Sequence, residues 1–303
     1  MIIFVRILGP FVVSFITIVV YIAGFANPVF APVKSVKILG ANSWENSQIQ
    51  EMQSYTLDDQ INPPDIKSTS YLVKNLTTDQ ILYKKYSHNP LPIASLTKLM
   101  TAWVVLKHGS LDDTYTITNS DTENISPDLG LRIGDTIKLN DLVHALLIGS
   151  ANDSAMALGG YIKSKTGKDI STLMNAEAKN LGLSDSRYQN PIGFDSDNNY
   201  SSAEDVALLV KKLKETGIFV TTQRANSYSF KSAEGKPYEI SATNKLIAKY
   251  NDLNAVKTGF TNLALGSMVT TLTLNDEEYL IVVIGSSDRE GDTLLFRKLI
   301  LEK

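Results

Sequence analysis

The chain has 303 residues, 43% of them hydrophobic, with a formal net charge of -3 and no cysteine. The absence of cysteine excludes a thiol nucleophile, an iron–sulfur cluster, a cysteine-ligated zinc site and a disulfide framework. The three histidines never occur in HExxH spacing, and the near-neutral charge argues against a nucleic-acid partner. We therefore predict a site built from hydroxyl, amine, carboxylate and backbone groups, with no metal and no cofactor.

The N-terminal segment is apolar and is predicted to enter a membrane. No charged residue occurs in the range 7–33, and the range 7–26 has the roughly 20 residues that span a bilayer as a helix. We predict a transmembrane anchor within residues 1–33. A cleaved secretory signal is the alternative, because Arg6 precedes the apolar run and small residues around Gly24 could precede a cleavage site.

The polar segment that follows is predicted to be a linker. Residues 34–65 show no sustained periodicity and contain the sequence Asn62-Pro63-Pro64, which is typical of an extended connection. Residues 66–303 are then long enough to form one folded domain with a sizeable core.

The first elements of this domain are predicted to be a hairpin and a helix. Two short apolar runs, 71–75 and 81–86, favour antiparallel strands, and helical periodicity then begins close to Ser95 and stops at Gly109. Ser95 and Lys98, three residues apart, share one helix face. A serine hydroxyl needs a base, and the partial positive charge of a helix start lowers the pKa of a lysine there.

The second candidate motif, Ser150-Ala151-Asn152, lies between two predicted helical stretches, residues 140–147 and 153–162. A hydroxyl at Ser150 could return a proton to a leaving amine, and the Asn152 amide could hold a peptide group of the substrate.

The C-terminal part is predicted to return to strands. A capped helix is expected to run through Leu213, and strands over 268–274 and 279–284 are expected to form a hairpin before a final helix over 293–301. Strands at both ends with helices between them indicate an α+β fold.

The third candidate motif is Lys257-Thr258-Gly259, at the entrance to this hairpin. The lysine and threonine can bind a carboxylate, and the glycine lets the edge of a sheet approach a ligand closely. Similar triplets occur elsewhere. Ser87-His88-Asn89 and Ser196-Asp197-Asn198 fall in predicted loops, and Lys165-Thr166-Gly167 is interpreted as the end of a helix.

The three motifs together resemble those of the serine D-alanyl-D-alanine carboxypeptidases, the low-molecular-mass penicillin-binding proteins. The resemblance rests on the strings 94–102, 150–153 and 257–261 and extends over roughly residues 66 to 300. It implies a β-lactamase/transpeptidase-like fold, in which an antiparallel sheet packs with a helical cluster.

The resemblance also implies the role of each motif residue. Ser95 would attack the carbonyl between two D-alanines, Lys98 would accept its proton, and the charge of Lys257 would keep Lys98 neutral. Ser150 would return the proton to the leaving group, and Asn152 would orient the peptide.

The remaining implied roles concern the substrate's oxygens. The backbone N–H groups of Ser95 and Phe260 would hold the oxyanion. Thr258 and an arginine, for which Arg289 is the candidate, would bind the terminal carboxylate. The sequence departs from the family at Ala264-Leu265-Gly266, where the glycine is shifted by one residue and the strand geometry is in question.

The implied function is removal of the terminal D-alanine from peptidoglycan stem pentapeptides, with β-lactams as further small-molecule ligands. The domain would lie outside the cytoplasmic membrane, anchored by the N-terminal helix, or would be secreted after cleavage. The alternatives are a D,D-endopeptidase, which uses the same residues, a serine β-lactamase and a silent wall-binding protein. A β-lactamase of the commonest class needs a glutamate between the second and third motifs, where residues 184–190 offer only Asp185.

Overall fold

The computed structural model describes residues 3–5, 16–18, 63, 65–123 and 128–303. The chain divides into two compact units, Met1–Thr56 and Leu57–Lys303. In the first unit, strands β1 (Ile3–Val5) and β2 (Ile16–Ile18) pair antiparallel. The rest of the predicted anchor and nearly all of the predicted linker lie outside the described residues, so both stay predictions. Within the described ranges, no helix is both long and apolar enough to cross a bilayer.

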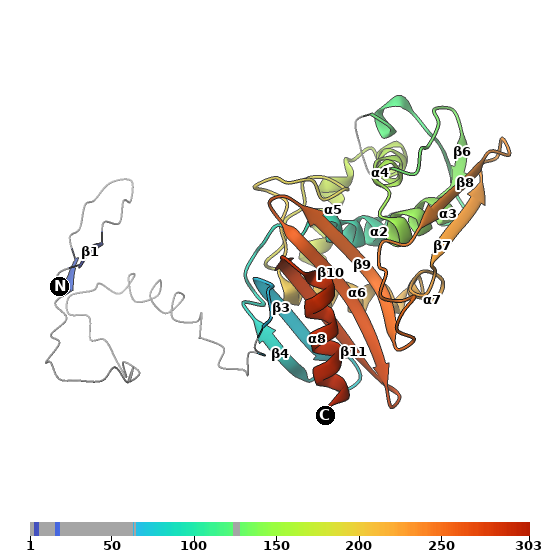
Figure 1. The fold of residues 1–303 in the computed structure, drawn as a ribbon. Coiled ribbons are helices and arrows are strands. Elements are labelled where there is room, and N and C mark those ends of the chain that lie inside the picture. The colour runs from blue at the N-terminus through green and yellow to red at the C-terminus, as the bar shows by residue number, and fades with distance from the viewer. Residues whose placement is uncertain (1–2, 6–15, 19–62, 64, 124–127) are drawn as a thin grey trace, which may run out of the picture. The chain divides into compact units, whose positions relative to one another are not determined.

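The second unit is built on a five-stranded antiparallel sheet that joins the two ends of this unit (Figure 1). The hairpin predicted after residue 70 is present. Its first strand pairs with the last strand of the sheet, with residues 70–75 opposite residues 279–284. In spatial order the strands are β4 (Ile81–Lys85), β3 (Ser70–Asn75), β11 (Glu277–Ser286), β10 (Leu265–Leu274) and β9 (Leu253–Thr261).

The sheet separates two hydrophobic cores, because neighbouring residues of a strand point to opposite faces. In β11, Val282 belongs to the larger core under the helical cluster, whereas Val283 belongs to the smaller core under the C-terminal helix, with Phe296. This confirms the α+β class and the antiparallel sheet packed with helices. The helices are α2 (Thr97–His108), α3 (Leu139–His144), α4 (Asn152–Thr166), α5 (Ile170–Leu181), α6 (Ala203–Glu215), α7 (Phe219–Thr222) and α8 (Arg289–Leu301).

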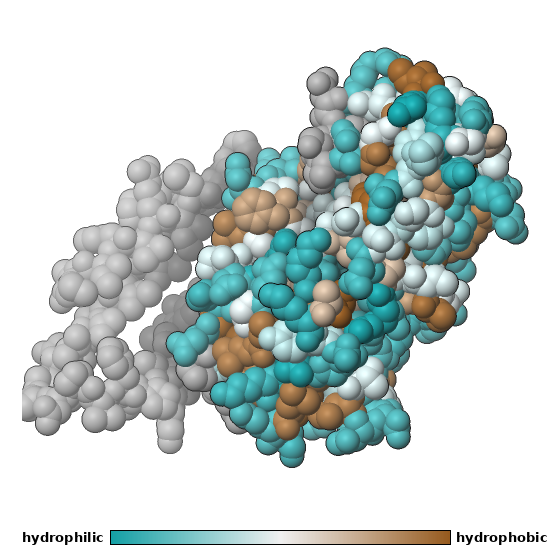
Figure 2. All heavy atoms as spheres, turned by 45° about the vertical axis from the view of Figure 1, so that its right-hand side comes forward, coloured by the Kyte–Doolittle hydropathy of each residue, from teal (hydrophilic) through white to brown (hydrophobic). Residues whose placement is uncertain are grey.

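Smaller elements border the helical cluster. On the face that Figure 2 presents, apolar side chains occur in small separate groups among polar ones. The sequence analysis did not predict the two short hairpins, because their strands are brief and rich in exposed polar residues. These elements are the hairpins of β5 (Thr114–Thr116) with β6 (Thr136–Lys138) and of β7 (Ser227–Lys231) with β8 (Pro237–Ser241), and the turns η1 (Ala94–Leu96), η2 (Asn119–Asp121) and η3 (Ala145–Gly149).

The helix predicted to begin close to Ser95 is confirmed, and two other predicted helix boundaries were wrong by a few residues. Ser95 lies in the 3₁₀ turn η1, and α2 begins two residues later. The helix predicted over 140–147 ends at His144 and continues as the π-helical turn η3. Helix α8 begins at Arg289, four residues earlier than predicted, because the Asp288 side chain caps it by accepting from the backbone N–H of residue 291.

The shifted glycine near the third motif is accommodated without breaking the sheet. Leu265 adopts a left-handed conformation, with φ of 55°, at the start of β10. The pairing of β10 with β9 is nevertheless continuous here, since Gly266 lies opposite Phe260 and Ser267 lies opposite Gly259. The irregularity appears on the other side, between Gly266 and Met268 against β11.

Candidate active site

The turn that carries Ser95 is held between two glycines. A Cβ atom on Gly193 would lie 2.0 Å from the Ala94 carbonyl oxygen, and one on Gly259 would lie 2.8 Å from the Ser95 backbone nitrogen. Ala94 itself adopts a left-handed conformation, with φ of 47°, which is uncommon for a non-glycine residue. The loop before α6 and strand β9 therefore touch the turn from opposite parts of the fold and fix the position of Ser95.

Lys98 lies fully buried beneath this turn and contacts three oxygen atoms. Its Nζ lies 2.9 Å from Ser95 Oγ, 2.7 Å from Asn152 Oδ1 and 2.7 Å from the Ile192 carbonyl oxygen. A neutral lysine has two N–H donors and one lone pair. When Lys98 is protonated, Nζ donates to all three oxygen atoms. In the neutral form the amide and carbonyl oxygens can take both N–H donors, which leaves the lone pair for the Ser95 hydroxyl. This is the arrangement that a general base for Ser95 needs.

Burial is the main reason why Lys98 can be neutral. It lowers the pKa of Lys98 to about 7 from an ordinary value of 10.5. Lys257 is also buried, and its pKa is lowered first by burial and then by the positive charges of Lys98 and Arg289. The sequence analysis attributed the low pKa of Lys98 to the helix start and to Lys257. In the structure desolvation dominates for both amines.

The pH dependence of acylation follows from the pKa of Lys98. Protonated Lys98 cannot accept the Ser95 proton, so kcat/KM should fall about tenfold per pH unit below about pH 7 and level off above it. The measurement is the rate of covalent acylation by a penicillin between pH 5 and 9. A flat profile across this range would exclude Lys98 as the base.

The second motif is positioned by an unusual local backbone. Ser150 ends the π-helical turn in a left-handed conformation, with φ of 62°, and Asn152 starts α4. Both residues are buried, and Asn152 contacts Lys98 as described above. Gly149 makes this turn possible, because a Cβ atom there would lie 2.1 Å from the side chain of Ile240 in β8. Hairpin β7–β8 thus packs directly against the turn that carries Ser150.

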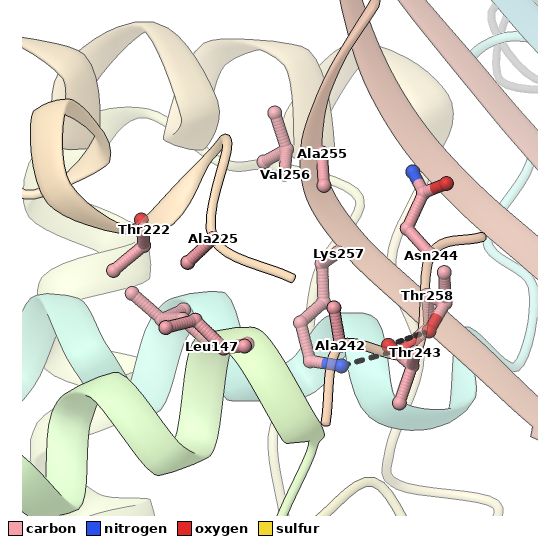
Figure 3. A pocket seen from close by; sticks show the side chains of 11 residues that line it. Leu147, Thr222, Ala225, Ala242, Thr243, Asn244, Ala255, Val256, Lys257 and Thr258 are labelled. Carbon is pink, nitrogen blue, oxygen red and sulfur yellow. Dashed lines mark hydrogen bonds between the residues drawn. The ribbon is translucent and has the colours of Figure 1, made fainter. Parts of the chain in front are cut away.

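The third motif lies on β9, one of the two edge strands of the sheet. Lys257 Nζ donates to the Thr258 carbonyl oxygen at 2.8 Å, and the Thr258 hydroxyl donates to the Thr243 hydroxyl at 2.6 Å. Figure 3 shows these side chains at one end of a small pocket that Leu147 and Val256 also line. Burial on this edge keeps the Lys257 amine out of bulk water, while Gly259, two residues later, lies against the Ser95 turn.

Arg289 reaches the third motif from the start of α8. Its Nη1 donates to the Gly259 carbonyl oxygen at 2.6 Å, and its Nε pairs with Glu290 at 3.0 Å. Gly266 leaves room for this arginine, since a Cβ atom there would lie 3.2 Å from Arg289 Cδ. The structure therefore places the arginine candidate against β9. The Phe260 side chain, next to Gly259, is 64% exposed.

Sequence reasoning missed the residues that act through their backbone or support another side chain. The Ile192 carbonyl, Gly193 and Thr243 belong to this group. The signal for the first two was the Asn190-Pro191 turn, because Asn190 Oδ1 accepts from the backbone N–H groups of residues 192, 193 and 194.

The lysine-threonine-glycine triplet at residues 165–167 has the structural role that was predicted. Lys165 pairs with Asp113 at 2.7 Å, and Gly167 ends α4 in a left-handed conformation, with φ of 72°.

Gly259→Ala should disable the site. The added Cβ would push the Ser95 backbone nitrogen or β9 aside, and displacements of about 1 Å in a catalytic site can cost about 100-fold in rate. Acylation by penicillin measures the effect. Gly159→Ala is the matched control, because its Cβ would meet its nearest neighbour, Ile170, at 3.3 Å. Acylation at the normal rate in Gly259→Ala would show that the close approach is dispensable.

The comparisons with known proteins identify the family of this chain. The model of the D-alanyl-D-alanine carboxypeptidase family matches residues 58–288. The chain belongs to the D-alanyl-D-alanine carboxypeptidase family. Among curated relatives, D-alanyl-D-alanine carboxypeptidase DacF of Bacillus subtilis is 30% identical over 69% of this chain and 55% of its own length. The D-alanyl-D-alanine endopeptidase of Escherichia coli is 31% identical over 73% of this chain and 72% of its own length.

Solved structures support the family fold. A Streptomyces DD-transpeptidase superimposes with a TM-score of 0.71 at 25% identity, covering 77% of this chain and 97% of that chain. Penicillin-binding protein D2 of Listeria monocytogenes, in its ampicillin-bound form, gives a TM-score of 0.67 at 27% identity. The match covers 78% of this chain and 98% of that chain. This chain spans 55% and 63% of the length of the first two curated carboxypeptidases that it matches.

Proposed function

We propose that the protein is a serine D-alanyl-D-alanine carboxypeptidase that removes the terminal D-alanine from peptidoglycan stem pentapeptides and is acylated by β-lactams. The observation that carries this proposal is the contact of the buried Lys98 amine with Ser95 Oγ at 2.9 Å. A serine hydroxyl beside a lysine whose pKa is about 7 is an activated nucleophile near neutral pH. Membership of the carboxypeptidase family supports the choice of substrate.

In the proposed reaction, Ser95 Oγ attacks the carbonyl carbon between the two D-alanines as its proton moves to Lys98. The oxyanion is held by the backbone N–H groups of Ser95 and Phe260. Ser150 passes a proton to the leaving amine, and D-alanine departs. Water then hydrolyses the ester at Ser95 and regenerates the enzyme.

Substrate binding is assigned to the polar groups around this path. Asn152 orients the peptide. The buried Lys257 amine is assigned to the same binding region, close enough to Lys98 for the charge of Lys98 to lower the pKa of Lys257. Thr258 and Arg289 bind the terminal carboxylate, because Thr258 precedes Gly259 on β9 and Arg289 reaches the Gly259 carbonyl from α8.

A D,D-endopeptidase acting on crosslinked peptidoglycan is the second candidate function. The endopeptidase of Escherichia coli is as similar to this chain as the Bacillus carboxypeptidase. Both reactions break the same kind of bond and use the same nucleophile.

The structure gives no support to a β-lactamase that turns penicillin over rapidly. Asp185, the only carboxylate in the range 184–190, contacts His88 at 3.1 Å and Ser202 at 3.3 Å. No contact between Asp185 and Ser95 occurs in the described part of the chain. We therefore expect a long-lived penicillin adduct.

The location of the enzyme is part of the proposal. Peptidoglycan lies outside the cytoplasmic membrane, so we infer an extracytoplasmic domain. It is held by a single-pass anchor within residues 1–33 and a linker over residues 34–65, or is secreted if the apolar segment is cleaved. The apolar composition of residues 7–26 supports this inference.

The test is D-alanine release by the full-length protein in detergent. A pentapeptide ending in D-Ala-D-Ala should yield one free D-alanine per peptide, and ampicillin should add its own mass to the tryptic peptide that contains Ser95. Cleavage of a crosslinked dimer into its two peptides, with no D-alanine released from the pentapeptide, would establish the endopeptidase instead. A protein that neither releases D-alanine nor becomes labelled would refute the proposal.

A further inference from the structure

The Ser150 hydroxyl makes no hydrogen bond within the described residues, although Ser150 is only 4% exposed. Its direction is therefore set by the backbone of its own turn. That backbone is uncommon for a serine, because φ is 62° and the residue ends a π-helical turn. Such a conformation persists only where the surrounding structure holds it. The contacts of the turn therefore identify what positions Ser150.

Three residues at and just after the end of β8 contact this turn. We term them the supporting segment, which consists of Ile240, Ala242 and Thr243. Ile240 lies against Gly149, where an added Cβ atom would lie 2.1 Å from Ile240 Cδ1 and Cγ1. Ala242 shares a small hydrophobic core with Ile148, and the Thr243 backbone N–H donates to the Ile148 carbonyl at 3.1 Å. The supporting segment thus contacts the two residues directly before Ser150.

Hairpin β7–β8, which carries this segment, is held at two further places. The Tyr228 ring stacks on His144, the last residue of α3, with ring centroids 4.6 Å apart. The Tyr238 hydroxyl donates to Asp135 Oδ2 at 2.5 Å. The hairpin therefore lies beside α3 and spans the π-helical turn, with Tyr228 at the start of the turn and Ile240 at its end (Figure 1).

The position of Ser150 matters for one step of the proposed reaction. When the amide bond breaks, the leaving nitrogen gains a proton as the C–N bond is lost, and Ser150 passes this proton on from Lys98. A thioester at the same place needs no such transfer. Its electron pair leaves on sulfur as a thiolate, because thiols have pKa values of about 8.5. A shift of Ser150 by about 1 Å should therefore slow amide cleavage and spare thioester cleavage.

We propose that Ile240 is a positioning residue that acts through Gly149 to hold the Ser150 hydroxyl beside the leaving amine. This inference rests on the proposed function, which assigns the proton transfer to Ser150. It gives hairpin β7–β8, none of whose side chains takes part in the proposed reaction, the task of supporting that transfer.

The test compares kcat/KM of the full-length protein in detergent for two substrates. One is a pentapeptide ending in D-Ala-D-Ala, and in the other thioglycolate replaces the last D-alanine, which keeps a terminal carboxylate. The ratio of the two kcat/KM values, amide over thioester, reports the proton transfer. Gly149→Ala should lower this ratio about 100-fold, because the new Cβ displaces the turn. Ile240→Ala, which leaves the turn unsupported, should lower it about tenfold.

The double variant Gly149→Ala with Ile240→Ala gives the sharpest result. Ile240→Ala removes the two atoms that the new Cβ would meet at 2.1 Å and leaves only the Cβ of residue 240, at 3.1 Å. Ile240→Ala should therefore lower the ratio in the unchanged protein but raise it about tenfold in Gly149→Ala. Ile133→Ala is the matched control, because Ile133 is 60% exposed in the loop between β5 and β6, and should leave the ratio unchanged.

Equal losses for both substrates, or an unchanged ratio in the variants, would overturn the positioning role. So would a further fall of the ratio when Ile240→Ala is added to Gly149→Ala. The end point of penicillin labelling counts the folded protein in each sample, and if Gly149→Ala does not fold, the ratio in Ile240→Ala decides. A failure of the proposed function gives a different result, because the unchanged protein would then cleave neither substrate, and the inference would fall with it.

Discussion

Ser95→Ala is expected to abolish penicillin labelling and to lower D-alanine release by at least about 10⁴-fold, the largest loss of any single substitution in this protein. Alanine removes the only oxygen that Lys98 holds in position to attack a substrate carbonyl. The second hydroxyl, on Ser150, lies in a separate turn and makes no hydrogen bond to Lys98 among the described residues. It cannot replace Ser95.

The measurement combines gel detection of a fluorescent penicillin with a D-alanine assay. Ser229→Ala is a suitable control, since Ser229 is exposed on β7 and should label like the unchanged protein. Hydrolysis at the normal rate by Ser95→Ala would assign the nucleophile elsewhere.

Lys98→Met should be the next most damaging change, with acylation slowed by about 10²- to 10⁴-fold. Methionine is similar in length and suits a buried position, so the helix should remain folded. Ser95 then keeps its position but has no base, and two oxygen atoms, from Asn152 and Ile192, lose their donor.

The shape of the pH profile separates a base from a structural lysine. In Lys98→Met the acylation rate should be lower, and its rise near pH 7 should disappear. Lys165→Met, which changes the lysine of the surface triplet that ends α4, should keep both the rate and the profile. A Lys98→Met protein with a slower but unchanged pH profile would contradict the role of Lys98 as base.

Local features of this site were predictable from sequence. Ser95 and Lys98 are three residues apart, and this spacing alone places their side chains on the same face of one helical turn. Gly259 was predicted to allow a close approach, and the structure shows that its neighbour is the backbone of Ser95 itself. The resemblance to a known family supplied the order of the three motifs, which composition and periodicity could not.

Other features depend on tertiary contacts that leave little trace in the sequence. The Ile192 carbonyl that binds Lys98 is a backbone group, and any residue type could supply it. Thr243 meets Thr258 only because the segment after β8 folds back over β9. The low pKa of Lys98 was expected from nearby positive charge, but its main cause is burial, which only the packed structure reveals.

The burial of Lys98 also makes folding release a proton. Its pKa is about 7 in the folded domain and near 10.5 when the chain is unfolded, so between these values the unfolded state binds more protons. The contribution of this amine to the free energy of unfolding is therefore fully present above about pH 10.5 and is lost as the pH falls toward 7. Near neutral pH the protein thus maintains its base at the expense of stability. Acidification from about pH 10.5 to 7 weakens the fold while the amine stays neutral, and below about pH 7 the loss of stability from this amine levels off as Lys98 takes up its proton and Ser95 loses its base.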